Sequence, residues 1–155
     1  MGRAADDAAI IRSSSTGAAE STGSGQAGGL VGGLNDEASV HDSYASGSAT
    51  GPTHTGGLVG IAHGGTTIER SYAVGAVSSD GGGLLGTAFN VGHTIVDSYW
   101  DTESTARDTS EGDGAEGLTT DQMTGSDAVE HMDGFDFGGT WMVTDGYPAL
   151  SWETP

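Results

Sequence analysis

Residues able to do chemistry occur at several places in the chain, and their spacing limits what each could do. Two stretches, 23–28 and 81–86, match the G-x-G-x-x-G pattern of dinucleotide-binding loops. Neither leads into a predicted helix, whose N-terminus would hold the phosphate, so the sequence predicts no nucleotide site. His41, Asp42 and Ser43 are adjacent. Neighbouring side chains of a strand point to opposite faces, so these three do not form a catalytic triad.

Residue types that bind metals are present without a repeated arrangement. The loop at 111–116 offers carboxylates from Glu111, Asp113 and Glu116, which are oxygen ligands suited to Ca²⁺. It lacks the EF-hand spacing and the calcium-binding nonapeptide of solenoids, so a solvated acidic loop is expected. The five histidines occupy non-equivalent positions of the chain: His41, His54, His63, His93 and His131.

Other catalytic signatures are missing as well. The sequence contains no G-x-S-x-G elbow and no H-E-x-x-H motif. Cysteine is absent, which excludes disulfides, zinc–thiolate sites and thiol nucleophiles. We therefore assign no catalytic, cofactor-binding or metal-binding residue, expect no cofactor, and interpret the chain as non-enzymatic. A carbohydrate-active β-helix enzyme with paired carboxylates and a Ca²⁺-binding surface module are the alternatives.

An internal repeat sets the elements that position these residues. A glycine-rich run, GGLVG or GGLLG, occurs at 28–32, 56–60 and 82–86. Each copy is followed by a second signature, which reads VHDSY at 40–44, IERSY at 68–72 and IVDSY at 95–99. A partial copy, IIRSSSTG at 10–17, matches 40–47 at a constant offset of 30 residues. The chain therefore begins in the middle of a repeat.

The composition of one repeat predicts strands that are stacked in register. Each unit of about 26–28 residues contains short apolar runs separated by Gly, Ser and Thr, which is typical of strands and turns. A unit with so few apolar side chains buries them only by stacking on its neighbours, at a strand spacing of about 4.8 Å. The sequence predicts an all-β fold, a parallel β-solenoid (β-helix) of about three to four coils. A sandwich or propeller-like array of antiparallel hairpins is the alternative.

Three columns of equivalent residues test this prediction. Tyrosines are expected to stack at Tyr44, Tyr72 and Tyr99. Leucines are expected to stack at Leu30, Leu58 and Leu84. A third column alternates in charge, and its members are Arg12, Asp42, Arg70 and Asp97. Opposite charges one strand apart stabilise each other by about 0.2–1 kcal/mol, so we expect Arg70 to lie beside both aspartates of this column.

The pattern stops after Tyr99. Residues 101–155 contain 13 of the 22 acidic residues, and Thr119 with Gln122 forms a capping box that predicts a short helix. Five of the ten aromatic residues lie between Phe135 and Trp152. This concentration predicts an aromatic cap that closes the last coil, with a sugar-binding platform as the alternative.

Charge and composition restrict the environment and the partners. The chain has 22 acidic residues against four arginines and no lysine, for a net charge of −18. This charge opposes binding to nucleic acid and to anionic membranes, and no apolar run approaches the length of a membrane span. The N-terminal stretch is not a signal peptide. Because salt screens self-repulsion, we interpret the chain as adapted to high salt; an ordinary acidic extracellular domain is the alternative.

These signatures resemble the GLUG-motif repeat family of bacterial and archaeal surface and secreted proteins, here of haloarchaeal character. The matching residues are the GGLVG runs and the I-x-x-S-Y-A-x-G signature, which is clearest at 68–75. The resemblance implies an extracellular or cell-surface repeat module, structural or adhesive, whose partners are neighbouring coils or a protein or glycan ligand. The predicted division is a degenerate first coil at 1–27, three repeats at 28–106, and an acidic loop with a capping segment at 107–155.

Overall fold

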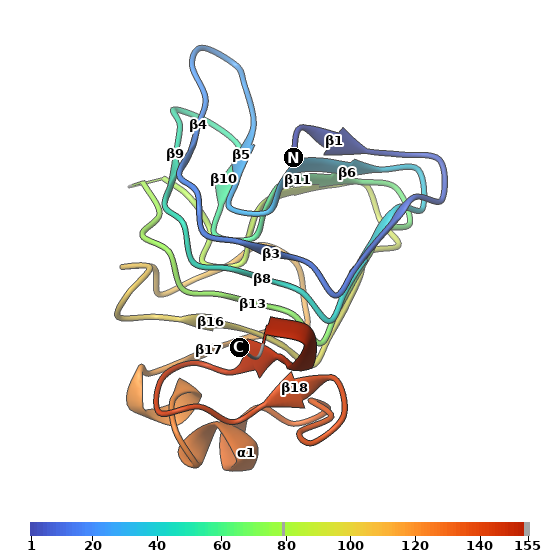
Figure 1. Cartoon of the computed structure of the whole chain (residues 1–155). Coiled ribbons are helices and arrows are strands. Elements are labelled where there is room, and N and C mark those ends of the chain that lie inside the picture. Colours follow the sequence, from blue (N-terminus) through green and yellow to red (C-terminus); the bar gives the residue numbers. More distant parts are fainter. Residues whose placement is uncertain (79, 154–155) are drawn as a thin grey trace.

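Equivalent residues lie above one another because each coil adds one strand to the same sheets. The structure is a computed structural model that describes residues 1–78 and 80–153 (Figure 1). Sheet A contains β1 (Arg3–Ala4), β6 (Val31–Asn35), β11 (Val59–His63) and β14 (Leu85–Phe89). Sheet B contains β2 (Ala9–Ile11), β7 (Ser39–His41), β12 (Thr67–Glu69) and β15 (Thr94–Val96). Sheet C contains β3 (Ser14–Ser15), β8 (Tyr44–Ala45), β13 (Tyr72–Ala73), β16 (Ser98–Asp101) and β17 (Ala115–Leu118).

Short strand pairs complete the coils on the remaining side. The first pair consists of β4 (Ala19–Glu20) and β9 (Ala49–Thr50). The second consists of β5 (Ala27–Gly28) and β10 (Thr55–Gly56). Neighbouring strands of all these sheets run parallel, so the predicted all-β parallel solenoid is confirmed and the array of antiparallel hairpins is wrong.

The register follows the sequence repeat. Tyr72 pairs with Tyr44 on one side and with Tyr99 on the other. The Tyr44 and Tyr72 rings stack with centroids 4.9 Å apart and planes inclined by 4°. The Phe135 ring packs against two tyrosine rings, with its centroid 6.3 Å from that of Tyr72 and 5.8 Å from that of Tyr99. The register of the tyrosine column is therefore as predicted, but ring stacking is shown for Tyr44 and Tyr72, while the Tyr99 ring contacts Phe135.

The inside of the solenoid is a narrow apolar core. One aliphatic column crosses sheet B, and its buried members are Ile10, Val40, Ile68 and Ile95. The leucine column is equally regular, with the Leu30 N–H donating to Leu58 O at 3.0 Å and the Leu58 N–H donating to Leu84 O at 2.9 Å. The space beside this column leaves no room for a side chain at Gly57, because a Cβ there would lie 2.1 Å from Gly83 O. The repeated glycine thus lets neighbouring coils approach.

The C-terminal segment covers the outer face of sheet C. Its elements are η1 (Asp121–Met123), α1 (Asp127–His131), β18 (Trp141–Met142), β19 (Ala149–Leu150) and η2 (Ser151–Glu153). Figure 1 shows this segment, in orange and red, beneath the strands of sheet C. Thr119 and Gln122 form the predicted capping box at the start of η1: each backbone N–H donates to the other side chain, at 2.9 and 3.3 Å.

The position of this segment corrects one prediction. The aromatic residues of the C-terminal segment do not gather at the end of the last coil but along its side, because the tyrosines of sheet C point outward while their neighbours Ala45, Ala73 and Trp100 point inward. The tyrosines form a second core with residues of the C-terminal segment, among them Met123, Met132, Phe135, Trp141 and Leu150. At the end of the solenoid, Gly112 of the acidic loop lies against Ile95 and Leu85 instead.

Candidate functional site

The repeated Ser-Tyr signature forms the corner between sheets B and C. The residue before each serine is in the left-handed region, with φ between 46° and 48° for Arg12, Asp42, Arg70 and Asp97. This conformation is uncommon outside glycine and is costly unless neighbouring contacts fix it. The serine supplies such a contact, since its hydroxyl spans the left-handed residue: Ser43 Oγ donates to His41 O at 2.7 Å.

The same hydroxyls also connect the coils. Ser43 Oγ accepts from the Ser13 N–H at 3.0 Å, Ser71 Oγ accepts from the Ser43 N–H at 3.1 Å, and Ser98 Oγ accepts from the Ser71 N–H at 3.3 Å. Ser71 and Ser98, like Ser43, are almost fully buried. The serines are therefore part of the framework, and Ser43 is not available as a nucleophile beside His41 and Asp42.

The charged column at this corner forms one of its predicted contacts. Arg70 donates from Nε to Asp42 Oδ1 at 2.7 Å and from Nη2 to Asp42 Oδ2 at 3.1 Å, and these hydrogen bonds raise the pKa of Arg70. Within the described residues, its second acidic partner is Glu69 of its own coil and not Asp97. Asp97 is turned toward the C-terminal segment, where it lies against Gly134.

Asp101 is a buried carboxylate that anchors the C-terminal segment. It accepts hydrogen bonds from Tyr147 Oη at 2.6 Å and Thr120 Oγ1 at 2.7 Å, and from the backbone N–H groups of Glu103 and Ser104 at 2.8 and 3.0 Å. Burial alone would raise the pKa of Asp101, but these donors outweigh it and lower the pKa. All of these donors are residues of the last coil or of the C-terminal segment, so the Asp101 carboxylate is a structural anchor between the two.

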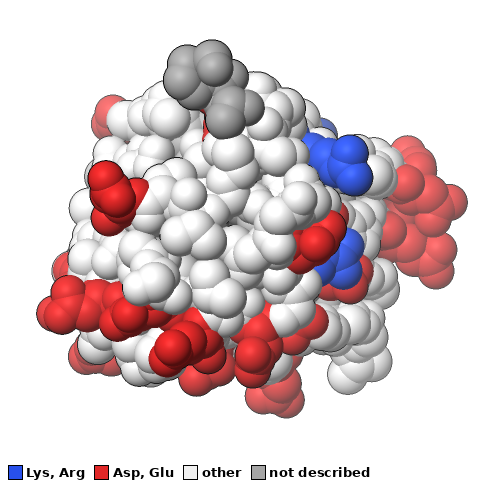
Figure 2. All heavy atoms as spheres, turned by 60° about the horizontal axis from the view of Figure 1, so that its bottom comes forward, with Lys and Arg blue, Asp and Glu red and all other residues white. Residues whose placement is uncertain are grey.

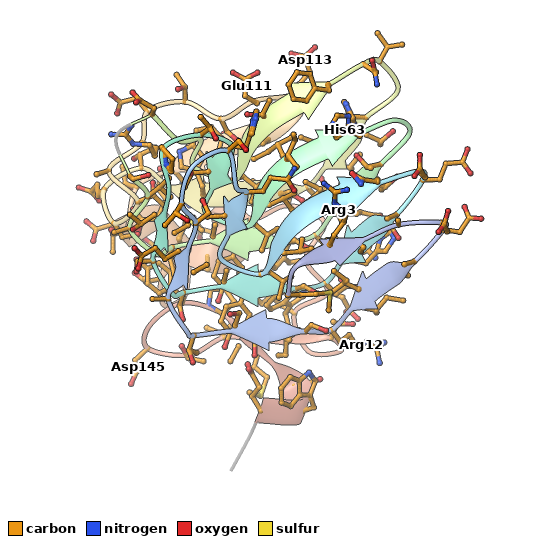
Figure 3. The ribbon with its side chains drawn as sticks, turned by 90° about the horizontal axis from the view of Figure 1, so that it is seen from above. Arg3, Arg12, His63, Glu111, Asp113 and Asp145 are labelled. Atoms are coloured by element: carbon orange, nitrogen blue, oxygen red, sulfur yellow. The ribbon has the colours of Figure 1, made fainter. Side chains whose placement is uncertain are left out.

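The residues considered as metal ligands do not converge. Across residues 1–78 and 80–153, no group of three or more His, Asp or Glu side chains is arranged to hold a metal ion. Glu111 and Asp113 lie near each other at the outer edge of the molecule (Figure 3), and Glu116 is paired with Tyr99 in the register of sheet C. His41 Nδ1 lies 3.0 Å from Glu69 Oε2 instead.

The outer face of sheet A gathers side chains that the repeat does not explain. We name this set the polar–aromatic face; its members are Arg3, Asn35, His54, His63, Thr87 and Phe89. His63 pairs in register with Asn35 on one side and with Phe89 on the other. The His63 and Phe89 rings stack with centroids 4.9 Å apart, and His54 meets the same phenyl ring edge-on at 5.7 Å.

A hollow of about 310 Å³ lies at the end of this face, lined by Arg3, Asn35, Asp36, His63, Gly64 and Asn90. Figure 3 views the face from above and shows Arg3 and His63 on neighbouring parts of it. Sequence reasoning noted the histidines but did not find this face, because its residues differ from coil to coil. The available signal was an aromatic residue, Phe89, at the outward position of a strand whose inward neighbour is Ala88.

Comparisons with known proteins agree with this geometry. The GLUG motif family matches residues 23–50 and 51–78. Halomucin from Haloquadratum walsbyi is 40% identical over 157 residues, an alignment that covers 99% of this chain and 2% of halomucin. The chain therefore spans a very small part of that relative. In the described residues no helix is long and apolar enough to cross a membrane.

A solved structure supports the fold. A Bacteroides ovatus protein, described as a candidate immunoglobulin A1 protease, superposes with a TM-score of 0.62. It is 23% identical, and the match covers 94% of this chain and 58% of that one. At this identity the likeness concerns the fold and not the activity. Repeat signature, register and relatives agree, and the chain is a GLUG-repeat protein with a β-solenoid fold, similar to part of a haloarchaeal halomucin.

Proposed function

We propose that the chain is a non-enzymatic structural and adhesive module of a cell-surface or secreted protein that works in high salt. The observation that carries this proposal is the use of the repeated residues. Ser43, Ser71 and Tyr72 are all committed to contacts between coils or with the C-terminal segment. A chain whose repeated residues build a scaffold presents its variable residues to a partner.

The relative supports the proposed location. The names of the relative, halomucin, and of its organism, Haloquadratum walsbyi, agree with a surface protein in a salt-rich environment. Figure 2 shows carboxylates mainly along the left and lower margins of the face formed by the C-terminal segment, with arginines on the right of the view. Exposed acids of that segment include Asp121, Asp127, Glu130, Asp133 and Asp145. Such a surface stays soluble where salt screens its self-repulsion.

The enzymatic alternative has less support. A glycoside hydrolase needs two carboxyl groups about 5–9.5 Å apart across a groove. The hollow on the polar–aromatic face has one carboxylate, Asp36, in its lining. The larger hollow, of about 490 Å³, is lined by Asp6, Asp7, Asp36 and Glu37 with two glycines and has no aromatic side chain. We therefore favour binding over turnover.

The proposal is tested by measuring adhesion and turnover on the same preparation. Fluorescently labelled protein is mixed with cell envelopes of a haloarchaeon in about 2 M KCl, where charges are strongly screened, and sedimented. We expect saturable co-sedimentation and no release of reducing ends from a polysaccharide panel. A control uses envelopes with added excess unlabelled protein, which should displace the signal. Absence of saturable binding, or polysaccharide cleavage that Asp36→Asn abolishes, would contradict the proposal.

A further inference from the structure

We propose that the polar–aromatic face of sheet A binds a neutral glycan. In this arrangement the open side of the Phe89 ring, which His63 supports from behind, contacts the apolar face of a sugar ring. Arg3 donates hydrogen bonds to hydroxyls of the glycan, and Asn35 exchanges hydrogen bonds with them. The inference rests on the proposed adhesive function and adds to it the chemical class of the ligand and the residues that recognise it.

The first argument is that the Phe89 ring is held in place by its neighbours and is still exposed. Phe89 remains 41% exposed although its ring is held by two others, His63 at 4.9 Å and His54 at 5.7 Å. His54 is itself fixed, because its Nδ1 lies 3.0 Å from Thr87 Oγ1. An aromatic ring that is held in place and still open loses little conformational entropy when a ligand stacks on it.

The second argument is an uncommitted polar group beside the aromatic pair. Asn35 Oδ1 is shielded from solvent and has no hydrogen-bond partner in the part of the chain that the structure describes. Leaving such an atom unpaired costs about 1–3 kcal/mol, so its retention calls for an explanation. A hydroxyl group donates and accepts, and it can therefore pair with either end of an amide that turns toward the hollow.

The third argument is the spacing of the row. Asn35, His63 and Phe89 occupy one register position on three adjacent strands, β6, β11 and β14. Adjacent strands lie about 4.8 Å apart, so the row extends for about 10 Å across the sheet. Arg3 on β1 is in register with Gly33, two residues before Asn35, and it lines the same hollow as Asn35 and His63. Its long contact with Gln26 Oε1, at 3.5 Å, leaves most of its donors available. An extended oligosaccharide crossing the strands would meet all four side chains.

Charge selects a neutral ligand over an anionic one. Asp36 lines the hollow on this face, and it also borders the larger hollow with Asp6, Asp7 and Glu37. Together with the net charge of −18, these carboxylates repel sulfated or carboxylated glycans. At 1 M salt the screening length is only about 3 Å, so the distant charges no longer act and the repulsion comes from Asp36 in the hollow itself, whereas stacking and hydrogen bonding to hydroxyls are not weakened.

The test uses the full chain in about 2 M KCl. Saturation-transfer difference NMR is recorded with maltohexaose, cellohexaose, laminarihexaose and mannohexaose as neutral probes, and with a sulfated heparin hexasaccharide as the anionic probe. Calorimetry then gives the affinity for each probe that responds. We expect at least one neutral hexasaccharide to bind and the sulfated one to be silent.

Variants assign the binding to this face. Phe89→Ala is expected to weaken the neutral glycan by about five-fold or more, since it removes one stacking ring, and Asn35→Ala should weaken it as well. Val129→Ala is the matched control, because Val129 is similarly exposed, at 47%, but lies on α1 beneath sheet C. Circular dichroism checks that each variant is folded, and Asn35→Ser replaces the first asparagine variant if it is not.

Several outcomes would overturn the inference: silence of every neutral probe, preference for the sulfated probe, or binding that Phe89→Ala leaves unchanged. Its failure differs from failure of the proposed function. If envelope binding persists in Phe89→Ala, adhesion stands and this face is not the site. If envelope binding is absent from the unmodified chain, the adhesive function itself fails.

Discussion

At the scale of single residues, the serine of each signature has two structural roles: it connects neighbouring coils and it holds the left-handed residue before it. Ser71 Oγ accepts from the Ser43 N–H of the preceding coil and donates to Glu69 O across the left-handed Arg70. Removing the hydroxyl leaves the buried Ser43 N–H without that partner, and Glu69 O keeps the hydrogen bond from the Asp42 N–H. We expect Ser71→Ala to lower the free energy of unfolding by about 1–3 kcal/mol in urea denaturation. Ser46→Ala, at an exposed position, should change it by less than about 0.5 kcal/mol. Equal effects of the two would contradict the role of the serine ladder.

The Asp101 anchor predicts a pH dependence. The folded state lowers the pKa of Asp101, so the unfolded state binds the proton more readily. The stability contributed by this carboxylate is therefore fully present above its unfolded pKa, near 3.8, and is lost as pH falls through the lower folded value. We expect Asp101→Asn to destabilise the protein at pH 7 and the difference from the unmodified chain to shrink below about pH 4. Thermal unfolding measured across pH checks this, with the exposed Asp121→Asn as control. A difference independent of pH would argue against the anchor.

At the scale of elements, the C-terminal segment connects coils that are far apart in the sequence. We call the contacts of Trp152 and Glu153 with the coils the clasp. Glu153 of η2 accepts from Ser14 Oγ at 2.7 Å and from Tyr44 Oη at 3.0 Å, and Trp152 Nε1 donates to Arg12 O at 3.0 Å. The contacts of Ser14 and Arg12 join η2 to the first coil, about 140 residues earlier in the sequence, and the contact of Tyr44 joins it to the second coil. The Tyr72 hydroxyl donates to Pro148 O within the same interface.

The clasp is tested by hydrogen exchange. We expect Glu153→Ala to speed amide exchange in peptides covering 9–20 by about ten-fold, because within the described residues β2 and β3 pair only with β7 and β8 and gain further contacts from η2. Peptides covering 59–73, in the middle of the stack, should exchange as before. Asp145→Ala is the control, since Asp145 is exposed and points away from the solenoid in Figure 3. Unchanged exchange at 9–20 in Glu153→Ala would show that the clasp does not stabilise the first coil.

The sequence was sufficient for the solenoid but not for every placement on it. Repeated letters at a fixed spacing predict which residues stack, and Tyr72 does lie between Tyr44 and Tyr99. The side on which the tyrosines lie depends on the bend at the left-handed corner, which no single residue type marks. Because the tyrosines point outward, the C-terminal segment packs along the side of the solenoid and not over its end. The polar–aromatic face could not be predicted, because Asn35, His63 and Phe89 share a position but not a chemistry.

At the scale of the whole molecule, the surface is an acidic shell around an uncharged interior. The two cores contain aliphatic and aromatic side chains, and nearly all of the 22 acidic residues are half-buried or exposed, with Asp42 and Asp101 as buried members. Close packing in such a core does not depend on salt, whereas repulsion among surface carboxylates does. Stability should therefore rise with salt concentration until the charges are screened.

The most direct test of a surface module folded for brine is its unfolding temperature from about 0.05 M to about 3 M KCl, over which the screening length falls more than seven-fold. The account predicts a steep rise in the midpoint at low salt that flattens above about 1 M, with the same trend in NaCl. A midpoint that stays constant or falls as KCl is added would contradict it.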